Sequence, residues 1–197
     1  MSRTIRATLA TGMLLLVLPF VVNAADEEMV DNPQYEVWAK FKPGATATVK
    51  EVTTFGSDKS IPDEKRITYT LVSVDNQKAI VRAVVVENEL LGTVESAPTR
   101  HIYPAKLKKS YLAVAAPDLA DKKGEETIKW KDKEVACKTM SGSYKKGGDT
   151  VEFKAWLSEA IPGGVVKRTR TLKGKEDTIT TTISLVSYRT ESAEKKK

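Results

Sequence analysis

The sequence contains one cysteine and one histidine among 197 residues. A single cysteine excludes a disulfide within the chain, and a single histidine excludes a zinc site with two or more histidines. His101 is the only histidine available as a base for a nucleophile, and no serine-elbow, phosphate-loop or calcium-loop motif occurs. No motif selects a catalytic pair among the 26 acidic residues. We therefore predict a protein that is not an enzyme, with no catalytic residues, cofactor or metal.

The composition excludes several other classes of protein. Hydrophobic residues make up 41% and charged residues 29% of the sequence, which is unlike a collagen-like, fully disordered or polytopic membrane protein. Residues 25–190 are long enough to bury a core without disulfide or metal staples. The composition therefore favours an ordinary globular domain.

The N-terminal segment has the three parts of a secretory signal peptide. Arg3 and Arg6 form a basic region, residues 9–22 are largely apolar, and Val22 and Ala24 occupy the −3 and −1 positions of a cleavage site. The alternative is a membrane anchor, but the apolar stretch is shorter than the about 20 residues that span a bilayer. We predict a cleaved signal peptide over residues 1–24 and an exported protein, periplasmic or extracellular, without a membrane span after cleavage.

Charge is distributed unevenly between the two halves of the chain. Residues 25–100 carry 9 basic and 13 acidic side chains, whereas residues 101–197 carry 21 basic and 13 acidic ones. A basic surface can meet acidic polymers, and the candidates for such a surface are Lys167, Arg168 and Arg170. The alternative is a solvated strand face, which the alternation of polar and apolar residues favours. No nucleic-acid partner is expected, because the chain lacks the known binding fingerprints.

Cys137 stands alone in a chain that is expected to be exported. An unpaired cysteine in an oxidising compartment either bridges two chains, acts as a reactive thiol, or is buried as a small apolar residue. Its surroundings read as a strand, which favours burial.

A short helix is predicted directly after the expected cleavage site. Asn32 can cap the helix and Pro33 can occupy its first position. Tyr35, Trp38 and Phe41 then recur every three residues on one face. This aromatic face is either a ligand clamp or, more commonly, the side by which a helix packs on a sheet.

From Ala45 onward the pattern of hydrophobic residues has a period of two. The alternating segments are separated by short turns such as Asp75-Asn76 and Lys146-Gly147-Gly148-Asp149. Hairpin connections imply antiparallel pairing, and one-sided alternation implies one buried face. We predict a mainly β protein: residues 25–190 form a single domain with one curved, half-barrel-like antiparallel sheet of about eight or nine strands, followed by a disordered basic tail over residues 191–197.

Two further local patterns carry predictions about the sheet. Thr70-Leu71-Val72-Ser73 recurs as Ser184-Leu185-Val186-Ser187, which is a faint sign of a two-lobed sheet. Trp156 alternates with Ala155 and Leu157, so it is expected on the opposite face from them. Because a large ring gains from burial, we predict that Trp156 is partly covered, by the N-terminal helix or by a ligand site beside it.

A resemblance to a known family rests on two late motifs. Ala155-Trp156-Leu157-Ser158 precedes Ile161-Pro162-Gly163-Gly164-Val165-Val166-Lys167 in a run of long strands after an aromatic helix. This arrangement resembles exported β-sheet proteins whose fold is similar to the outer-membrane lipoprotein carriers, the LolA/LolB-like superfamily. The resemblance implies a strongly curved antiparallel sheet that leaves an apolar cavity.

Two functional hypotheses follow from these patterns. The first is a non-catalytic exported protein that binds an apolar or amphipathic ligand, such as a lipid, or a partner segment in the hollow of the sheet, with Tyr35, Trp38, Phe41 and Trp156 as candidate contacts. The alternative is a structural or interaction module of the cell envelope that contacts acidic polymers or proteins through the basic C-terminal half.

Overall fold

The computed structural model describes residues 28–56, 62–89, 92–112, 120–175 and 177–190. The predicted signal peptide and the predicted tail both lie outside these residues. In chain order the elements are β1 (Met29–Asp31), α1 (Pro33–Ala39), β2 (Thr46–Phe55), β3 (Asp63–Val74), β4 (Lys78–Glu89), β5 (Gly92–Glu95), β6 (Thr99–Pro104), β7 (Lys106–Lys108), α2 (Lys109–Leu112), β8 (Lys122–Trp130), β9 (Lys133–Lys146), β10 (Asp149–Leu157), β11 (Val165–Lys173) and β12 (Thr178–Arg189).

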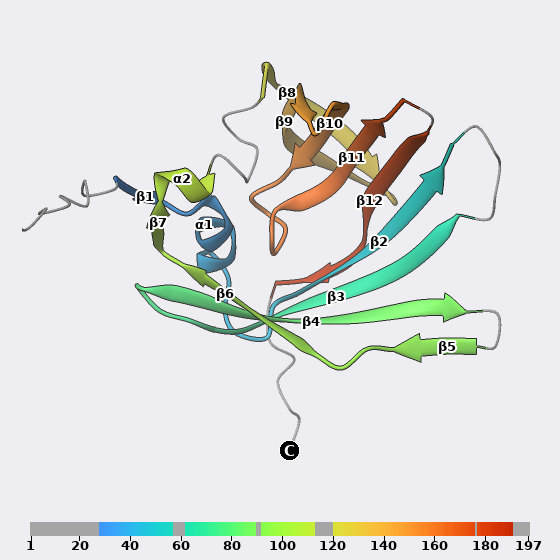
Figure 1. The fold of residues 1–197 in the computed structure, drawn as a ribbon. Coiled ribbons are helices and arrows are strands. Elements are labelled where there is room, and N and C mark those ends of the chain that lie inside the picture. The colour runs from blue at the N-terminus through green and yellow to red at the C-terminus, as the bar shows by residue number, and fades with distance from the viewer. Residues whose placement is uncertain (1–27, 57–61, 90–91, 113–119, 176, 191–197) are drawn as a thin grey trace, which may run out of the picture.

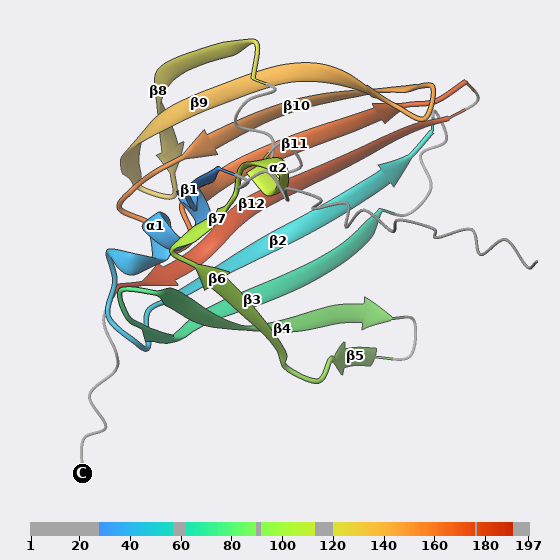
Figure 2. The same cartoon turned by 60° about the vertical axis from the view of Figure 1, so that its left-hand side comes forward.

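Ten of the described strands form one antiparallel sheet. Its order is β5-β4-β3-β2-β12-β11-β10-β9-β8, and β6 pairs with β4 off this path. The end strands β5 and β8 do not pair with each other, so the described sheet is open. Figures 1 and 2 show it bending through β2 and β12, so that β8–β11 and β3–β5 diverge as two arms. The predicted fold class, a mainly β protein with a large curved antiparallel sheet and a short N-terminal helix, is confirmed.

The predicted hairpin turns have the local chemistry that a tight reversal requires. Between β3 and β4, the carboxylate of Asp75 accepts hydrogen bonds from the backbone N–H groups of Gln77 and Lys78, at 2.8 and 2.9 Å. These bonds hold the pKa of Asp75 below its ordinary value. Between β9 and β10, Gly147 and Gly148 both have positive φ, which glycine adopts without a steric penalty.

Three register shifts bend the sheet, and each leaves one valine without a cross-strand partner. They fall at Val72 in β3, Val166 in β11 and Val186 in β12. A bulge of this kind increases the local bend and twist of its strand. Two of them lie inside the Leu-Val-Ser repeat seen in the sequence, so the repeat marks equivalent bends in two strands that flank β2.

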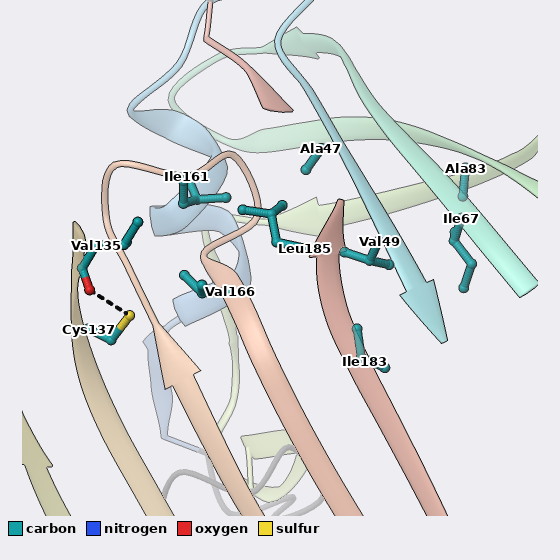
Figure 3. Close-up of a cluster of buried hydrophobic side chains, with 10 residues drawn as sticks. All are labelled: Ala47, Val49, Ile67, Ala83, Val135, Cys137, Ile161, Val166, Ile183 and Leu185. Atoms are coloured by element: carbon teal, nitrogen blue, oxygen red, sulfur yellow. Dashed lines mark hydrogen bonds between the residues drawn. The ribbon is translucent and has the colours of Figure 1, made fainter. Parts of the chain in front are cut away.

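Buried side chains form two apolar clusters on the sheet. Figure 3 shows the larger cluster, which joins side chains from β2, β3, β4, β9, β11 and β12 with Ile161 from the loop after β10. Cys137 belongs to it, with 3% of its surface exposed, and its Sγ donates to the carbonyl oxygen of Val135 at 3.5 Å. The thiol is free and buried, and burial raises its pKa, so the expectation of a buried cysteine is confirmed.

The smaller cluster contains α1. Asn32 caps this helix, because its side-chain oxygen accepts the N–H of Gln34 at 3.0 Å, and Pro33 opens the first turn as predicted. The side-chain amide of Asn32 also donates to the carbonyl oxygen of Pro104 at 2.8 Å. Trp38 then packs with Ala45, Leu71, Ala79 and Val81. The helix is thus fixed to the concave side of the sheet, between its two arms (Figure 2).

Candidate functional site

A cavity of about 280 Å³ lies on the concave side of the sheet beside α1. Its walls come from α1, β2, β3, β6, β11, β12 and the loop that precedes β11, namely Gln34, Trp38, Ala47, Val49, Tyr69, Tyr103, Pro162, Gly163, Val165, Arg168 and Ile183. Apolar and aromatic side chains dominate this lining, and Arg168 is its one charged member. Such a combination is typical of small-molecule sites, where a few polar groups orient an apolar ligand.

The three aromatic candidates near α1 have different positions. Trp38 is 3% exposed and lines the cavity. Tyr35 and Phe41 pack against the same cluster as Trp38 but do not line the cavity. The hydroxyl of Tyr35 donates to the carbonyl oxygen of Asp75 at 2.8 Å. Trp38 is therefore the ligand candidate of this group, while Tyr35 fastens α1 to the β3–β4 turn.

Three rings form a row at one side of the cavity. His101 lies between Tyr69 and Tyr103, with ring centroids 6.5 and 6.3 Å apart, and its plane is nearly parallel to that of Tyr103. The register explains the row, since His101 pairs with Val81 and Tyr103 with Ala79 on adjacent strands. His101 makes no side-chain hydrogen bond to another described residue.

Several polar groups of the lining have no partner among the described residues. The hydroxyls of Tyr69 and Tyr103, the indole N–H of Trp38 and the guanidinium of Arg168 form no hydrogen bond or ion pair with any described residue. No fully enclosed side-chain nitrogen or oxygen lacks a partner in the described part of the chain, so these four groups reach accessible space. Burial raises the pKa of both tyrosines, which keeps their hydroxyls protonated at neutral pH.

Arg168 owes its unpaired state to the register of the sheet. Ile183 separates it from Glu51 in a cross-strand row, and Glu51 in turn pairs with Lys65. The nitrogen of Lys65 lies 3.0 Å from the Glu51 carboxylate and so occupies that group. The charge of Arg168 instead reaches Tyr69, where it partly offsets the pKa increase that burial causes.

The loop over residues 158–164 closes one end of the cavity. Gly163 and Gly164 both have φ of +76°, which confirms the turn predicted for this motif. An added Cβ at Gly163 would lie 2.9 Å from Cζ2 of Trp38, and one at Gly164 would lie 3.2 Å from Cγ1 of Val37. Glycine is therefore required twice: for the positive φ and for the close approach of the loop to α1.

Trp156 lies away from this cavity. It pairs with Lys167, whereas its neighbour Ala155 pairs with Arg168, so the ring lies on the opposite face of the sheet from Arg168. The indole N–H donates to the carboxylate of Glu126 at 2.7 Å, and the amines of Lys154 and Lys167 lie 4.5 and 5.2 Å from the ring centroid. Trp156 is half-buried as predicted. The cover comes from the larger core cluster, Glu126 and two lysines, and not from α1 or from the cavity beside it.

The three basic candidates do not share one surface. Because Lys167 and Arg168 are consecutive in a strand, they point to opposite faces, and Arg170 shares the face of Arg168. Lys167 lies beside Trp156, Arg168 lines the cavity and Arg170 is exposed beyond it. Because side chains alternate between the two faces of a strand, the basic residues that are neighbours in the sequence lie on two different surfaces.

Other hollows of the described structure lie elsewhere on the sheet. One of about 370 Å³ at the β8 edge is lined by charged groups such as Glu126, Lys138 and Glu159, which are already paired with other side chains. Within the described residues no three His, Cys, Asp or Glu side chains gather in a way that could hold a metal ion. Nor does any described helix have the length and apolarity needed to cross a membrane.

Sequence reasoning missed most of the residues that line the cavity. Of Tyr69, Tyr103 and Arg168, only Arg168 is a candidate from the sequence, as part of a basic surface. The alternation of Ile67, Tyr69 and Leu71 is a signal that could have found Tyr69, because it puts this residue on the buried face of its strand. No local signal places Tyr103 or Arg168 beside Trp38, because the three residues come from β6, β11 and α1.

Comparisons with known proteins identify no family for this chain. No protein-family model and no curated protein matches the sequence. One similar solved structure is described as an outer membrane lipoprotein-sorting protein domain from Vibrio parahaemolyticus, with 11% identity, 77% of this chain and 87% of that chain covered, and a TM-score of 0.26. A second is a LolA superfamily protein from Nitrosomonas europaea, with 10% identity, coverages of 85% and 96%, and a TM-score of 0.22. At TM-scores this low the two similarities carry no argument, and the function is argued below from the cavity alone.

Proposed function

We propose that this protein is a non-catalytic exported binding protein that holds an apolar or amphipathic ligand in the cavity beside α1. The observation that carries the proposal is the cavity of about 280 Å³, bounded by Trp38, Tyr69 and Tyr103 and by aliphatic side chains. Burial of apolar ligand surface against such a lining is favourable by about 25 cal/mol per Å². This volume lies near the lower end of the about 300–1,000 Å³ of typical ligand pockets, which suits a small ligand.

A neutral fluorescent probe tests the proposal directly. We expect saturable binding of N-phenyl-1-naphthylamine to protein stripped of copurified lipid, with a change in Trp38 fluorescence. Val165→Phe should fill part of the cavity, since this half-buried residue lines it, and should weaken binding by at least about tenfold, equivalent to about 1.4 kcal/mol.

Val94→Phe is the matched control for this experiment, because Val94 is 50% exposed on β5 and does not line the cavity. It should bind the probe as the original chain does. Circular dichroism and thermal melting of both variants establish that they are folded. The proposal is rejected if the unmodified protein shows no saturable binding, or if folded Val165→Phe and Val94→Phe bind equally well.

The alternative function, contact with acidic polymers through the basic C-terminal half, has less support. Several lysines of that half are engaged with carboxylates, as in the pairs Lys138–Glu159 and Lys154–Glu126. A pull-down with an acidic polymer across a salt series distinguishes the two functions. Polymer binding should weaken steeply with salt, whereas binding of a neutral probe in the cavity should change little.

A further inference from the structure

The polar groups that line the cavity favour an anionic ligand over a cationic one. The lining groups that pair with no described residue are the Arg168 guanidinium, the hydroxyls of Tyr69 and Tyr103, the indole N–H of Trp38 and the side-chain amide of the exposed Gln34. Arginine and the indole only donate hydrogen bonds, and a protonated tyrosine donates one as well. No carboxylate is among the residues that line the cavity. The lining therefore offers several donors, one positive charge and only neutral acceptors, so a cationic ligand would find no counter-charge.

Resting on the proposed function, we propose that the ligand is an anionic amphiphile whose oxyanion head binds Arg168 while its apolar body lies against Trp38. The guanidinium fork fits both oxygens of a carboxylate or a phosphate. Arg168 is exposed and Trp38 is buried, so the head lies at the mouth of the cavity and the body lies inside. The head comes from a carboxylate such as that of a fatty acid, or from a phosphate such as that of a phospholipid.

The residues around Arg168 leave its guanidinium without a carboxylate partner among the described residues. The Glu51 carboxylate on the same face is two strands away, at a spacing of about 4.8 Å per strand, and is already held by Lys65 at 3.0 Å. Ile183 fills the position between them and supplies no polar group. Arg168 is thus left with its charge facing a largely apolar cavity, where water screens a bound anion less than it would on an open surface.

The size of the cavity suggests the probes. About 280 Å³ corresponds to about nine groups of the volume of a water molecule, about 30 Å³ each. Ten-carbon amphiphiles that differ only in the head group suit this volume: decanoate, decyl phosphate, neutral decanol and cationic decyltrimethylammonium. Each is titrated below its micelle concentration as a competitor of N-phenyl-1-naphthylamine.

The expected result is a preference that depends on Arg168. Decanoate and decyl phosphate should each compete at least about tenfold better than decanol, because hydrogen bonds to a charged group are among the stronger ones, and decyltrimethylammonium should compete worst. Arg168→Gln should bring both anions to the level of decanol. Arg170→Gln, on the same face but outside the cavity lining, should keep the full preference. Whichever of the two anions competes better identifies the source of the head group.

The outcomes separate this inference from the proposed function. If decanol competes but the anions are no better, or if Arg168→Gln retains the preference, the anionic ligand is rejected while the cavity remains a binding site. If the naphthylamine probe does not bind at all, the proposed function fails and this inference fails with it. An equal loss of preference in Arg170→Gln would assign the effect to general surface charge and overturn the role of Arg168.

Discussion

Trp38 and Trp156 occupy opposite faces of the same sheet, and the chain treats their polar ends differently. The N–H of Trp156 donates to Glu126, and two lysines flank its ring. The N–H of Trp38 has no partner among the described residues, although its ring is almost fully buried. On the sheet face that carries Trp156, other side chains of the protein bind its indole N–H and its ring. Beside α1, the hydrogen-bond donors that line the cavity have no partner among the described residues.

This difference distinguishes the surroundings of Trp156, where the polar groups are paired, from the candidate ligand-binding cavity, where they are not. The unpaired groups of the cavity are not enclosed, because they reach accessible space. Water or a ligand from outside the chain can accept their hydrogen bonds there. Around Trp156 the strands do pair their polar groups, since Glu126 binds both the indole N–H and the amine of Lys154. The open donors of the cavity are consistent with a partner that comes from outside the chain.

Replacing each tryptophan by alanine tests this comparison, and it should give the largest change in the free energy of unfolding. Trp38→Ala should lower the free energy of unfolding by about 4 kcal/mol, because it empties a buried site in the smaller core cluster. Trp156→Ala should lower it less, by about 2 kcal/mol, since the ring is only half-buried where it packs against the larger core cluster. Urea denaturation of both variants measures the difference. Equal losses in the free energy of unfolding would contradict the distinction between a fully buried ring and a half-buried one.

The contact between Gly163 and Trp38 gives the next largest effect. Gly163→Ala should destabilise the protein by about 3 kcal/mol, because it combines a positive φ with a Cβ only 2.9 Å from Cζ2 of Trp38. Gly148→Ala has a positive φ as well, but nothing lies within 4 Å of the added Cβ, and it should cost about 1 kcal/mol. Thermal melting monitored by circular dichroism compares the two. Similar melting temperatures would show that the loop does not press on the helix.

A smaller effect is expected in the solvent access of the two rings, which acrylamide quenching of tryptophan fluorescence measures. Removal of Trp156 by Trp156→Phe should reduce the fraction of fluorescence that acrylamide quenches readily, since this ring is partly exposed. Trp38→Phe should remove mainly the slowly quenched fraction, because Trp38 is 3% exposed. Stern–Volmer plots of both variants and of the original chain report these fractions. The opposite assignment would place Trp156, and not Trp38, in the protected environment.

The smallest effect concerns the acidic link that joins α1 to the outer strands. Hydrogen bonds from Lys138 and Lys40 lower the pKa of Glu159 to about 2. Because the folded pKa is below the ordinary value of 4.5, this stabilisation is present above about pH 4.5 and is lost as the pH falls toward 2. All three groups are well exposed, so the effect on melting temperature should be slight.

Glu159→Gln tests this link when melting is followed between pH 6 and pH 2. The variant should show a slightly shallower decline in melting temperature than the original chain. Glu152→Gln is the matched control, since Glu152 also pairs with a lysine, Lys173, but lies away from α1. A decline that is unchanged in Glu159→Gln would mean that the link contributes nothing.

The sequence by itself determined the local structure of this protein. Asn32 and Pro33 set the start of α1, because capping depends on residues next to each other in the chain. Asp75 and the Gly147-Gly148 pair set two of the hairpin turns for the same reason. The period of two predicted strands with a buried and a solvated face, and antiparallel pairing followed from the short connections.

Only the tertiary structure decided which residues share the cavity. Arg168 lies beside Tyr69, Tyr103 and Trp38 because of the pairing of β11 with β12 and of β6 with β4, together with the bulge at Val166. A shift of one residue in that register would move Arg168 to the outer face and Lys167 to the cavity. Register between strands far apart in the chain depends on packing of the whole sheet, and no local pattern specifies it. The chemistry of the site therefore emerges only when the sheet has formed.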